Sequence, residues 1–459
     1  MQMKMKTVVV AAMAACGMGA ALAQSTPSKV ELWGVVDAAV RHTTNEGADK
    51  GGLTKLIGGG MSQSRFGINV EEDLGGGSKA IAHLEHRFNA DTGMKDDTAP
   101  FFQLAYVGLQ GPYGRLTMGR QWNVLFDVVT STYASFPYSP YMDAYKPELG
   151  MAAGARTNNA LKYTLATPDR KWVGTLQYSF GEKNNTSSVQ QYAVGALNAS
   201  TNPQVAAVRT ALGGQYTAGA PIKNIPGLGN AVQQVINGVV QTSADSLSDP
   251  TGLKAKVEEV GMGAMKTFGG FLRYSANGLS LGAGAMRTTL PGGSDLDAYT
   301  FGGSYRSGLW YFNAGYGLNK YKPTKYANRV DSYINYLTDR QILNKMWSGQ
   351  TNGGFSGGYF ENAADKRQMI KLGVGYQATK QLNIGAHFFR AKQSGSSDGT
   401  YNGNANFMVL AADYAFSKRT DVYAALDHTK VSGGAGLVID PQSKTKTRTG
   451  ITVGLRHRF

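Results

Sequence analysis

The sequence of 459 residues is poor in several features that mark familiar protein classes. It contains one Cys, which leaves no partner for a disulfide and no Cys-based metal site. Charged residues make up 17% of the chain, against about 25% in an average protein. Mean hydropathy is −0.27, and no run of 18 apolar residues occurs beyond the first two dozen positions. A polytopic helical membrane protein is therefore excluded.

Glycine and aromatic residues are abundant instead. The chain has 60 Gly in 459 residues, against about 7% in an average protein, together with 24 Tyr and 18 Phe. Such a composition favours strands, tight turns and barrel corners over helical bundles or coiled coils. Aromatic and β-branched residues recur throughout, which also argues against a disordered chain.

The first 23 residues have the pattern of a secretory signal peptide. Two Lys residues precede a short apolar stretch, and Ala21-Leu22-Ala23 supplies the small residues of a cleavage site. We predict cleavage after Ala23, which would remove Cys16 and leave 24–459 as the mature chain. A lipoprotein signal ending at Cys16 is the alternative.

Apolar and polar side chains alternate with a period of two along most of the chain. In residues 172–180, large apolar side chains share one face, and Thr, Gln and Ser share the other. This period indicates strands rather than helices. We predict sixteen strands, over residues 30–42, 62–73, 78–90, 101–110, 114–121, 156–166, 171–181, 262–275, 278–290, 295–306, 309–321, 366–377, 380–393, 404–416, 419–431 and 446–459.

The connections between these strands alternate in length. Short turns such as Gly111-Pro112-Tyr113 alternate with long segments, apart from one brief connection at 291–294. This rhythm is typical of a closed transmembrane barrel, with tight periplasmic turns and long extracellular loops. A large soluble β-protein is the alternative. The predicted long connections are 43–61, 91–100, 122–155, 182–261, 322–365, 394–403 and 432–445, of which 182–261 and 322–365 are large extracellular insertions.

The free-energy cost of placing a charged side chain in lipid predicts which face of each strand points outward. A basic side chain on the lipid face costs about +2–4 kcal/mol at the bilayer midplane. The faces that carry Arg65, Lys162, Lys171 and Arg456 must therefore face an aqueous interior. The opposite faces, rich in Leu, Val, Ile and aromatic residues, then contact hydrocarbon.

Four groups of segments follow one another in a characteristic order along the chain. They are Val30-Glu31-Leu32-Trp33-Gly34-Val35-Val36-Asp37-Ala38, Ser64-Arg65-Phe66-Gly67 with Glu72-Asp73-Leu74-Gly75-Gly76-Gly77, Ala105-Tyr106-Val107-Gly108-Leu109 with Leu116-Thr117-Met118-Gly119-Arg120-Gln121, and Val453-Gly454-Leu455-Arg456-His457-Arg458-Phe459. In this order they resemble the general diffusion porins of the Gram-negative outer membrane. The resemblance covers the mature length and is strongest to the sixteen-stranded trimeric porins of beta-proteobacteria. It implies an all-β, sixteen-stranded antiparallel barrel in the outer membrane, surrounded by lipid and lipopolysaccharide, assembled as a homotrimer and open to small hydrophilic solutes.

The resemblance also implies particular functional residues. The connection 122–155 corresponds to the loop that folds inward as the constriction, and the terminal Phe459 corresponds to the assembly signal. Pro147-Glu148-Leu149-Gly150 resembles the Pro-Glu-Phe-Gly stretch of enteric porins, so Glu148 is expected to be an acid of the aperture. Asp143 and Asp127 are expected nearby.

A basic cluster is expected on the wall opposite that loop, formed by Arg65, Arg120, Arg156 and Lys162. The parity of Arg120 would turn it outward with Leu116 and Met118, unless Gly119 permits a bulge. Arginine stays charged at any relevant pH. With 46 Lys and Arg against 31 Asp and Glu, we expect the channel to prefer anions.

Nothing in the sequence indicates catalysis, a cofactor or nucleic-acid binding. His83 and His86 lie on opposite faces of one strand and cannot share a metal ion. The basic residues alternate along strands rather than clustering on a helix, which argues against nucleic acid. Two alternatives remain: a substrate-specific channel, in which the large loops or an aromatic of the aperture such as Tyr138 or Tyr141 bind one class of solute, and a barrel-anchored adhesin or enzyme.

Overall fold

The computed structural model describes most of the chain between Ser28 and Phe459. The signal peptide at 1–23, the insertion 182–261 apart from Thr210, and the residues Tyr138, Tyr141 and Asp143 lie outside the described part, so those predictions stay predictions. The described residues are 28–47, 49, 51–96, 100–135, 147–181, 210, 265–324, 336, 339, 340, 342, 343, 346, 347, 362–439 and 444–459.

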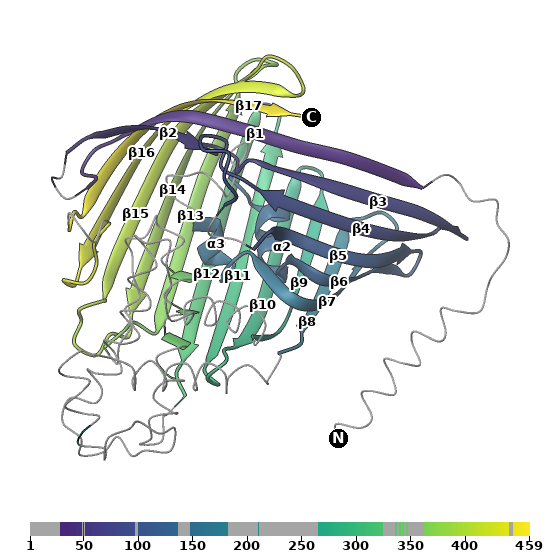
Figure 1. The fold of residues 1–459 in the computed structure, drawn as a ribbon, viewed down its shortest axis with the longest axis horizontal. Coiled ribbons are helices and arrows are strands. Elements are labelled where there is room, and N and C mark those ends of the chain that lie inside the picture. Colours follow the sequence, from purple (N-terminus) through teal and green to yellow (C-terminus); the bar gives the residue numbers. More distant parts are fainter. Residues whose placement is uncertain are drawn as a thin grey trace.

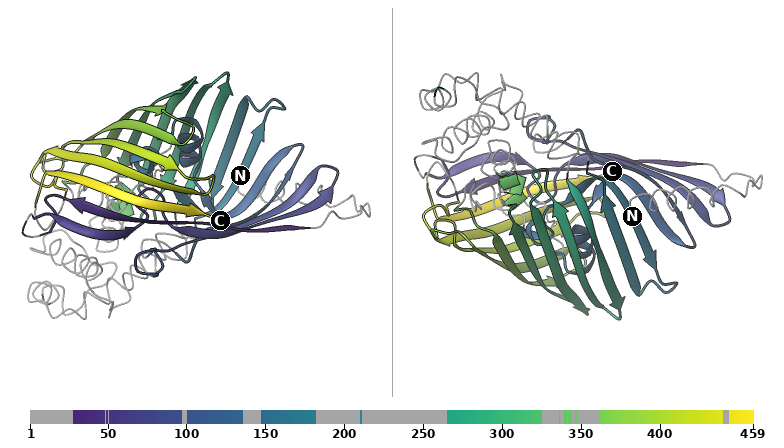
Figure 2. Two further views of the ribbon diagram at one scale, coloured as in Figure 1. Left: turned by 90° about the horizontal axis from the view of Figure 1, so that it is seen from above. Right: turned by 90° about the horizontal axis from the view of Figure 1, so that it is seen from below.

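The strands form one closed antiparallel sheet (Figures 1 and 2). Apart from β2 and β3, which both pair with β1, each strand pairs with its neighbours in sequence, and β1 pairs with β17, which closes the barrel. The strands are β1 (Lys29–Thr43), β2 (Leu53–Gly58), β3 (Arg65–Gly75), β4 (Ser78–Arg87), β5 (Phe102–Gly111), β6 (Gly114–Trp122), β7 (Arg156–Ala166), β8 (Trp172–Ser179), β9 (Lys266–Ala276), β10 (Leu279–Thr289), β11 (Asp295–Ser307), β12 (Trp310–Lys322), β13 (Lys366–Gln377), β14 (Leu382–Ser394), β15 (Gly403–Ala415), β16 (Thr420–Gly433) and β17 (Thr447–Arg458).

Two of these strands occupy the place of a single one. β1 pairs with β3 through Lys29–Val35 and with β2 through Ala38–Thr43, so β2 and β3 continue each other across a break. The barrel therefore has sixteen strand positions, and the predicted sixteen-stranded antiparallel barrel is confirmed. The prediction that 43–61 is a loop is wrong over Leu53–Gly58, where a short alternating stretch adds to the edge of β1.

The outer and inner faces follow the predicted parity. On β17, Ile451, Val453 and Leu455 are exposed on the outside, while Thr452 and Arg456, at the alternate positions, are buried on the inside. Aromatic rings pair at the short-turn end of the outer face, as in Trp310 with Tyr376 and Tyr414 with Phe416. An apolar band edged by aromatic rings is the outer surface that a bilayer requires.

Two helices cover part of the inner face. Helix α2 (Val124–Thr132) starts at Asn123, whose side chain accepts a hydrogen bond from the Phe126 amide at 2.7 Å. It packs on β8–β11, and α3 (Pro147–Met151) packs on β11 and β12 (Figure 1). A Cβ at Gly282 would lie 2.6 Å from Val128, so glycine there permits the close approach. No described helix is long and apolar enough to cross a membrane.

An apolar layer continues from these helices along the same wall. It reaches Leu343 and Trp347, from the connection between β12 and β13, and then Val431 at the end of β16. Trp347 is fully buried beside Arg367, whose guanidinium lies 4.6 Å from the ring centroid. The inner face of β9–β16 is thus largely covered. Residues 136–146 lie outside the described part, so the narrowing of the channel by 122–155 stays a prediction.

Candidate functional site

Arg65 and Arg156 share one acidic partner on the inner wall. Arg65 opens β3 and Arg156 opens β7, while Glu85 lies on β4 with its side chain on the same inward parity. Arg65 Nε lies 3.6 Å from one Glu85 oxygen, and Arg156 Nη2 lies 3.6 Å from the other. Glu85 is buried, so the carboxylate joins two arginines that are distant in sequence.

Arg120 joins this cluster through the predicted bulge. The pairing of β6 with β7 shifts register between Gly119 and Gln121, and Gly119 has φ of +130°. The Arg120 side chain therefore turns inward, where it donates to the Gln103 carbonyl at 3.0 Å and to the Asn158 side chain. Its guanidinium is close enough to that of Arg156 for the two to repel each other.

The cluster is held rigidly but keeps a positive charge. Arg156 lies over the Trp122 ring, 4.0 Å from its centroid. One carboxylate, Glu85, stands among three guanidinium groups, so the group has an excess of positive charge. Sequence reasoning missed Glu85, although its parity on β4 already placed an acid on the inner face, opposite Gly67 and next to Arg65 in the sheet.

Lys162 differs from the three arginines because an acid of α2 pairs with it directly. Its Nζ lies 2.7 Å from Asp127 Oδ2 and donates to the Trp122 carbonyl at 3.0 Å. Burial raises the pKa of Asp127, and the attraction of Lys162 offsets only part of that effect. The contact joins α2 to β7, so the charge of Lys162 is matched within the wall.

Glu148 also forms a buried ion pair. Its Oε1 lies 3.0 Å from Lys371 Nζ on β13 and accepts the Ser135 hydroxyl at 2.6 Å. Burial acts to raise the pKa of Glu148, but Lys371 and Ser135 together outweigh it and hold that pKa below its ordinary value. Sequence reasoning expected an acid facing the aperture, whereas the Glu148 side chain is only 2% exposed.

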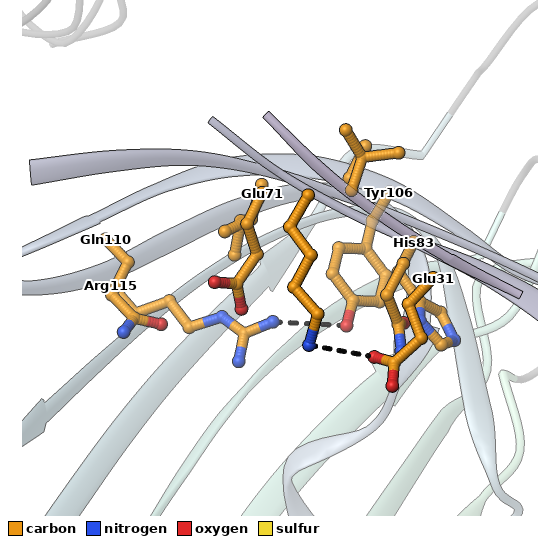
Figure 3. A pocket seen from close by; sticks show the side chains of 11 residues that line it. Glu31, Glu71, His83, Tyr106, Gln110 and Arg115 are labelled. Carbon is orange, nitrogen blue, oxygen red and sulfur yellow. Dashed lines mark hydrogen bonds and ion pairs between the residues drawn. The ribbon is translucent and has the colours of Figure 1, made fainter. Parts of the chain in front are cut away.

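A separate polar cavity lies on the inner wall toward the short-turn end of β1 and β3–β6 (Figure 3). It has a volume of about 270 Å³. His83 stacks between Trp33 and Tyr106, and Arg115 donates to the Tyr106 hydroxyl at 3.1 Å. Glu31 and Glu71 face the same space, so the cavity presents both signs of charge. The described residues include no group of three His, Cys, Asp or Glu placed to hold a metal ion.

The C-terminal Phe459 completes the seam between the first and last strands. Its amide donates to the Gly34 carbonyl and its carbonyl accepts from the Gly34 amide, both at 3.1 Å. The ring lies across Gly34 so closely that a Cβ there would be 2.3 Å from it. This contact fits the expected role of Phe459 in assembly, which stays a prediction.

Comparison with known proteins finds outer membrane porins. The chain is 31% identical over 230 residues to outer membrane porin protein 32 of Delftia acidovorans, covering 47% of this chain and 63% of that protein. It is 28% identical over 224 residues to an outer membrane porin protein of Bordetella pertussis, covering 45% of this chain and 55% of that protein. The matched part thus spans about three fifths of the length of these curated relatives.

The fold and the family agree with these matches. The structure is similar to that of the anion-selective porin from Comamonas acidovorans, with a TM-score of 0.57 and 20% identity, over 94% of this chain and 100% of that one. The sequence model of the Gram-negative porin family matches residues 7–434. The chain therefore belongs to the Gram-negative porin family and is a β-barrel of the outer membrane.

Proposed function

We propose that the protein forms a passive, water-filled channel for small hydrophilic solutes that prefers anions. The observation that carries this proposal is the cluster of Arg65, Arg120 and Arg156 on the inner wall around Glu85. Fixed guanidinium groups along a narrow aqueous path attract anions and repel cations. The relative from Comamonas is itself described as anion-selective, which supports the same preference here.

The open path is proposed to run along the β1–β7 wall. The opposite wall carries α2, α3 and the buried Trp347, which fill the interior on that side. The connection 122–155 is proposed to narrow the channel, because both of its described ends pack inside the barrel. Ions would then pass close to the arginine cluster, within about 8–10 Å, where salt screens its charge only in part.

Reconstitution in a planar lipid bilayer tests the channel itself. The purified protein should produce discrete conductance steps. In a KCl gradient, the zero-current potential should have the sign expected when Cl⁻ passes more readily than K⁺. Failure to conduct at all would reject the proposal, while conduction with a K⁺ preference would reject its anionic part. The proposed channel catalyses no reaction, so hydrolysis by the purified protein would argue for a barrel-anchored enzyme.

A substrate-specific channel is a second candidate, and the polar cavity of Figure 3 favours it. Its mixture of Lys29, Arg115, Glu31 and Glu71 could hold a solute that bears both charges. Specific binding would make conductance saturate with one solute and would make that solute block ion current. The general channel instead predicts current that rises in proportion to solute concentration.

We also propose that anionic lipopolysaccharide contacts one side of the barrel. On β9–β16, basic side chains project from the outer face near the long-loop ends of the strands. The described residues of β1–β8 and β17 carry no Lys or Arg on that outer face. Basic residues at a membrane interface bind anionic headgroups. The outward-facing cations are Lys266, Arg287, Lys320, Lys322, Lys366, Arg390, Lys392 and Lys430.

The arc without outward cations, β17 and β1–β8, is proposed to contact further copies in a homotrimer. Large apolar side chains on its outer face include Val36, Val107 and Leu176. Replacing Val107 with Lys should dissociate the oligomer in sedimentation experiments, and an unchanged oligomer would reject this arc. Replacing Lys320, Lys392 and Lys430 with Gln should reduce the lipopolysaccharide that co-purifies, and an unchanged amount would reject the lipid contact.

A further inference from the structure

The break between β2 and β3 is an inward fold of the chain. Pairing with β1 stops at Val35↔Arg65 and resumes at Ala38↔Gly58, so the six residues 59–64 stand opposite only Val36 and Asp37. Met61 and Ser64 have no exposed surface, although no strand pairs with this segment. We call Gly59–Ser64 the inner bend.

The carboxylate of Asp37 replaces the missing strand partner. It accepts backbone hydrogen bonds from Gly60 at 3.1 Å, Met61 at 3.3 Å and Ser62 at 2.7 Å. The Asp37 backbone is satisfied as well, because its amide donates to Ser64 Oγ and its carbonyl accepts from the Gly59 amide. A buried acid that accepts three successive amides fixes their conformation strongly.

Tyr423 holds the same bend from two strands away. It lies on β16, reaches across β17 at Gly454 and donates its hydroxyl to Asp37 Oδ1. A Cβ at Gly454 would lie 2.3 Å from the Tyr423 ring, so glycine at that position permits the crossing. The Tyr423 hydroxyl also accepts from the Met61 amide at 3.1 Å.

The inner bend leads directly into the arginine cluster. Arg65 is the first residue after the bend, and its Nη1 donates to the Gln63 carbonyl at 3.3 Å. Its Nε faces Glu85, which in turn faces Arg156. The position of the Arg65 guanidinium therefore depends on the conformation of residues 62–64, which Asp37 and Tyr423 hold.

We propose that Asp37 and Tyr423 are positioning residues for Arg65, and that the inner bend is a second inward element that helps to set the anion preference of the channel. This inference rests on the proposed function. Neither side chain lies on the surface of the channel, because Asp37 is fully buried and Tyr423 is 3% exposed. Their effect on selectivity is transmitted by the backbone of the bend to Arg65.

A double-mutant cycle tests the proposal in reconstituted channels. Arg65→Gln should lower the Cl⁻/K⁺ permeability ratio by about sixfold, because one unit charge about 8 Å away in water acts on the two ions with opposite sign. Tyr423→Phe should lower that ratio in the same direction by less than Arg65→Gln. In the Arg65→Gln background, Tyr423→Phe should cause no further change, because the residue through which it acts is gone. Tyr414→Phe, on the exposed outer face of β15, is the matched control and should have no effect.

The outcomes separate this inference from the proposed function. An equal change in selectivity from Tyr423→Phe with and without Arg65, or no change at all, would overturn the positioning role. A wild-type channel without anion preference would instead overturn the proposed function. Asp37→Asn should have a larger effect than Tyr423→Phe, and if that variant fails to fold, the Tyr423 cycle still decides the question.

Discussion

The two inner walls of the barrel use basic residues in opposite ways. On the β1–β7 wall, Arg65 keeps 24% of its side chain exposed and shares the Glu85 carboxylate with Arg156, while Arg120 lies near Arg156. On the β9–β16 wall, Lys371 is fully buried, paired with Glu148, and covered by α3. Inward parity alone therefore does not make a cation part of the channel surface, because the segments that fold into the barrel decide which charges meet water.

The largest expected effect comes from breaking the ion pair on the covered wall. Lys371→Met leaves Glu148 buried without its partner, so unfolding in lipid vesicles should become easier by about 3–5 kcal/mol. The double variant Lys371→Met/Glu148→Leu should recover most of that loss. If the single variant were as stable as the wild type, the pair would not hold α3 in place.

A smaller loss of stability is expected from the bulge on the open wall. In Gly119→Ala, the new Cβ would lie 2.3 Å from the Ala105 carbonyl at a φ of +130°, so we expect a cost of about 1–3 kcal/mol. Because Arg120 would be displaced, anion preference should fall as well. Gly174→Ala is the control, since its Cβ would meet nothing nearer than 3.8 Å. Unchanged selectivity would show that the bulge does not aim Arg120.

Removing the negative charge of Glu85 should strengthen the anion preference that the arginines of the open wall confer. Glu85→Gln deletes one negative charge, which at about 8 Å in water is worth about 0.5 kcal/mol for each ion, with opposite sign for Cl⁻ and K⁺. The Cl⁻/K⁺ permeability ratio should therefore change by about 1 kcal/mol, or about sixfold. The ratio should rise. Glu72→Gln on β3 serves as the control because that side chain has the outward parity. A fall in the ratio would mean that Glu85 acts mainly by holding Arg65 and Arg156 in position.

The sequence was sufficient for features with local causes. Period-two alternation predicts the strands and their inward faces, and Gly119 predicts the bulge at Arg120 because only glycine adopts that backbone conformation readily. The contacts that were missed join distant residues. Glu148 meets Lys371 across 223 positions, and Tyr423 meets Asp37 across 386. Such pairs depend on closure of the barrel, so no local pattern reveals them.

The smallest effect expected is a dependence on pH. The folded-state pKa of Glu148 lies below the ordinary 4.5, so its ion pair stabilises the docked α3 above that pH and is lost only as the pH falls through the lowered value. The folded-state pKa of Asp127 is instead raised above 3.8. The docked α2 therefore binds a proton more tightly than the undocked helix does, so lowering the pH does not weaken its docking. Hydrogen exchange measured as the pH falls below 4.5 should therefore show α3 opening before α2. The reverse order would contradict the assignment of the two pairs.

The most direct test is the zero-current potential of a triple variant in a KCl gradient. Arg65→Gln/Arg120→Gln/Arg156→Gln removes the charges of the open inner wall, and Lys320→Gln/Lys392→Gln/Lys430→Gln removes the same number from the outer face. We expect the first variant to lose the anion preference of the wild type and the second to keep it. Equal potentials for the wild type and the inner variant would contradict the central role of the arginine cluster.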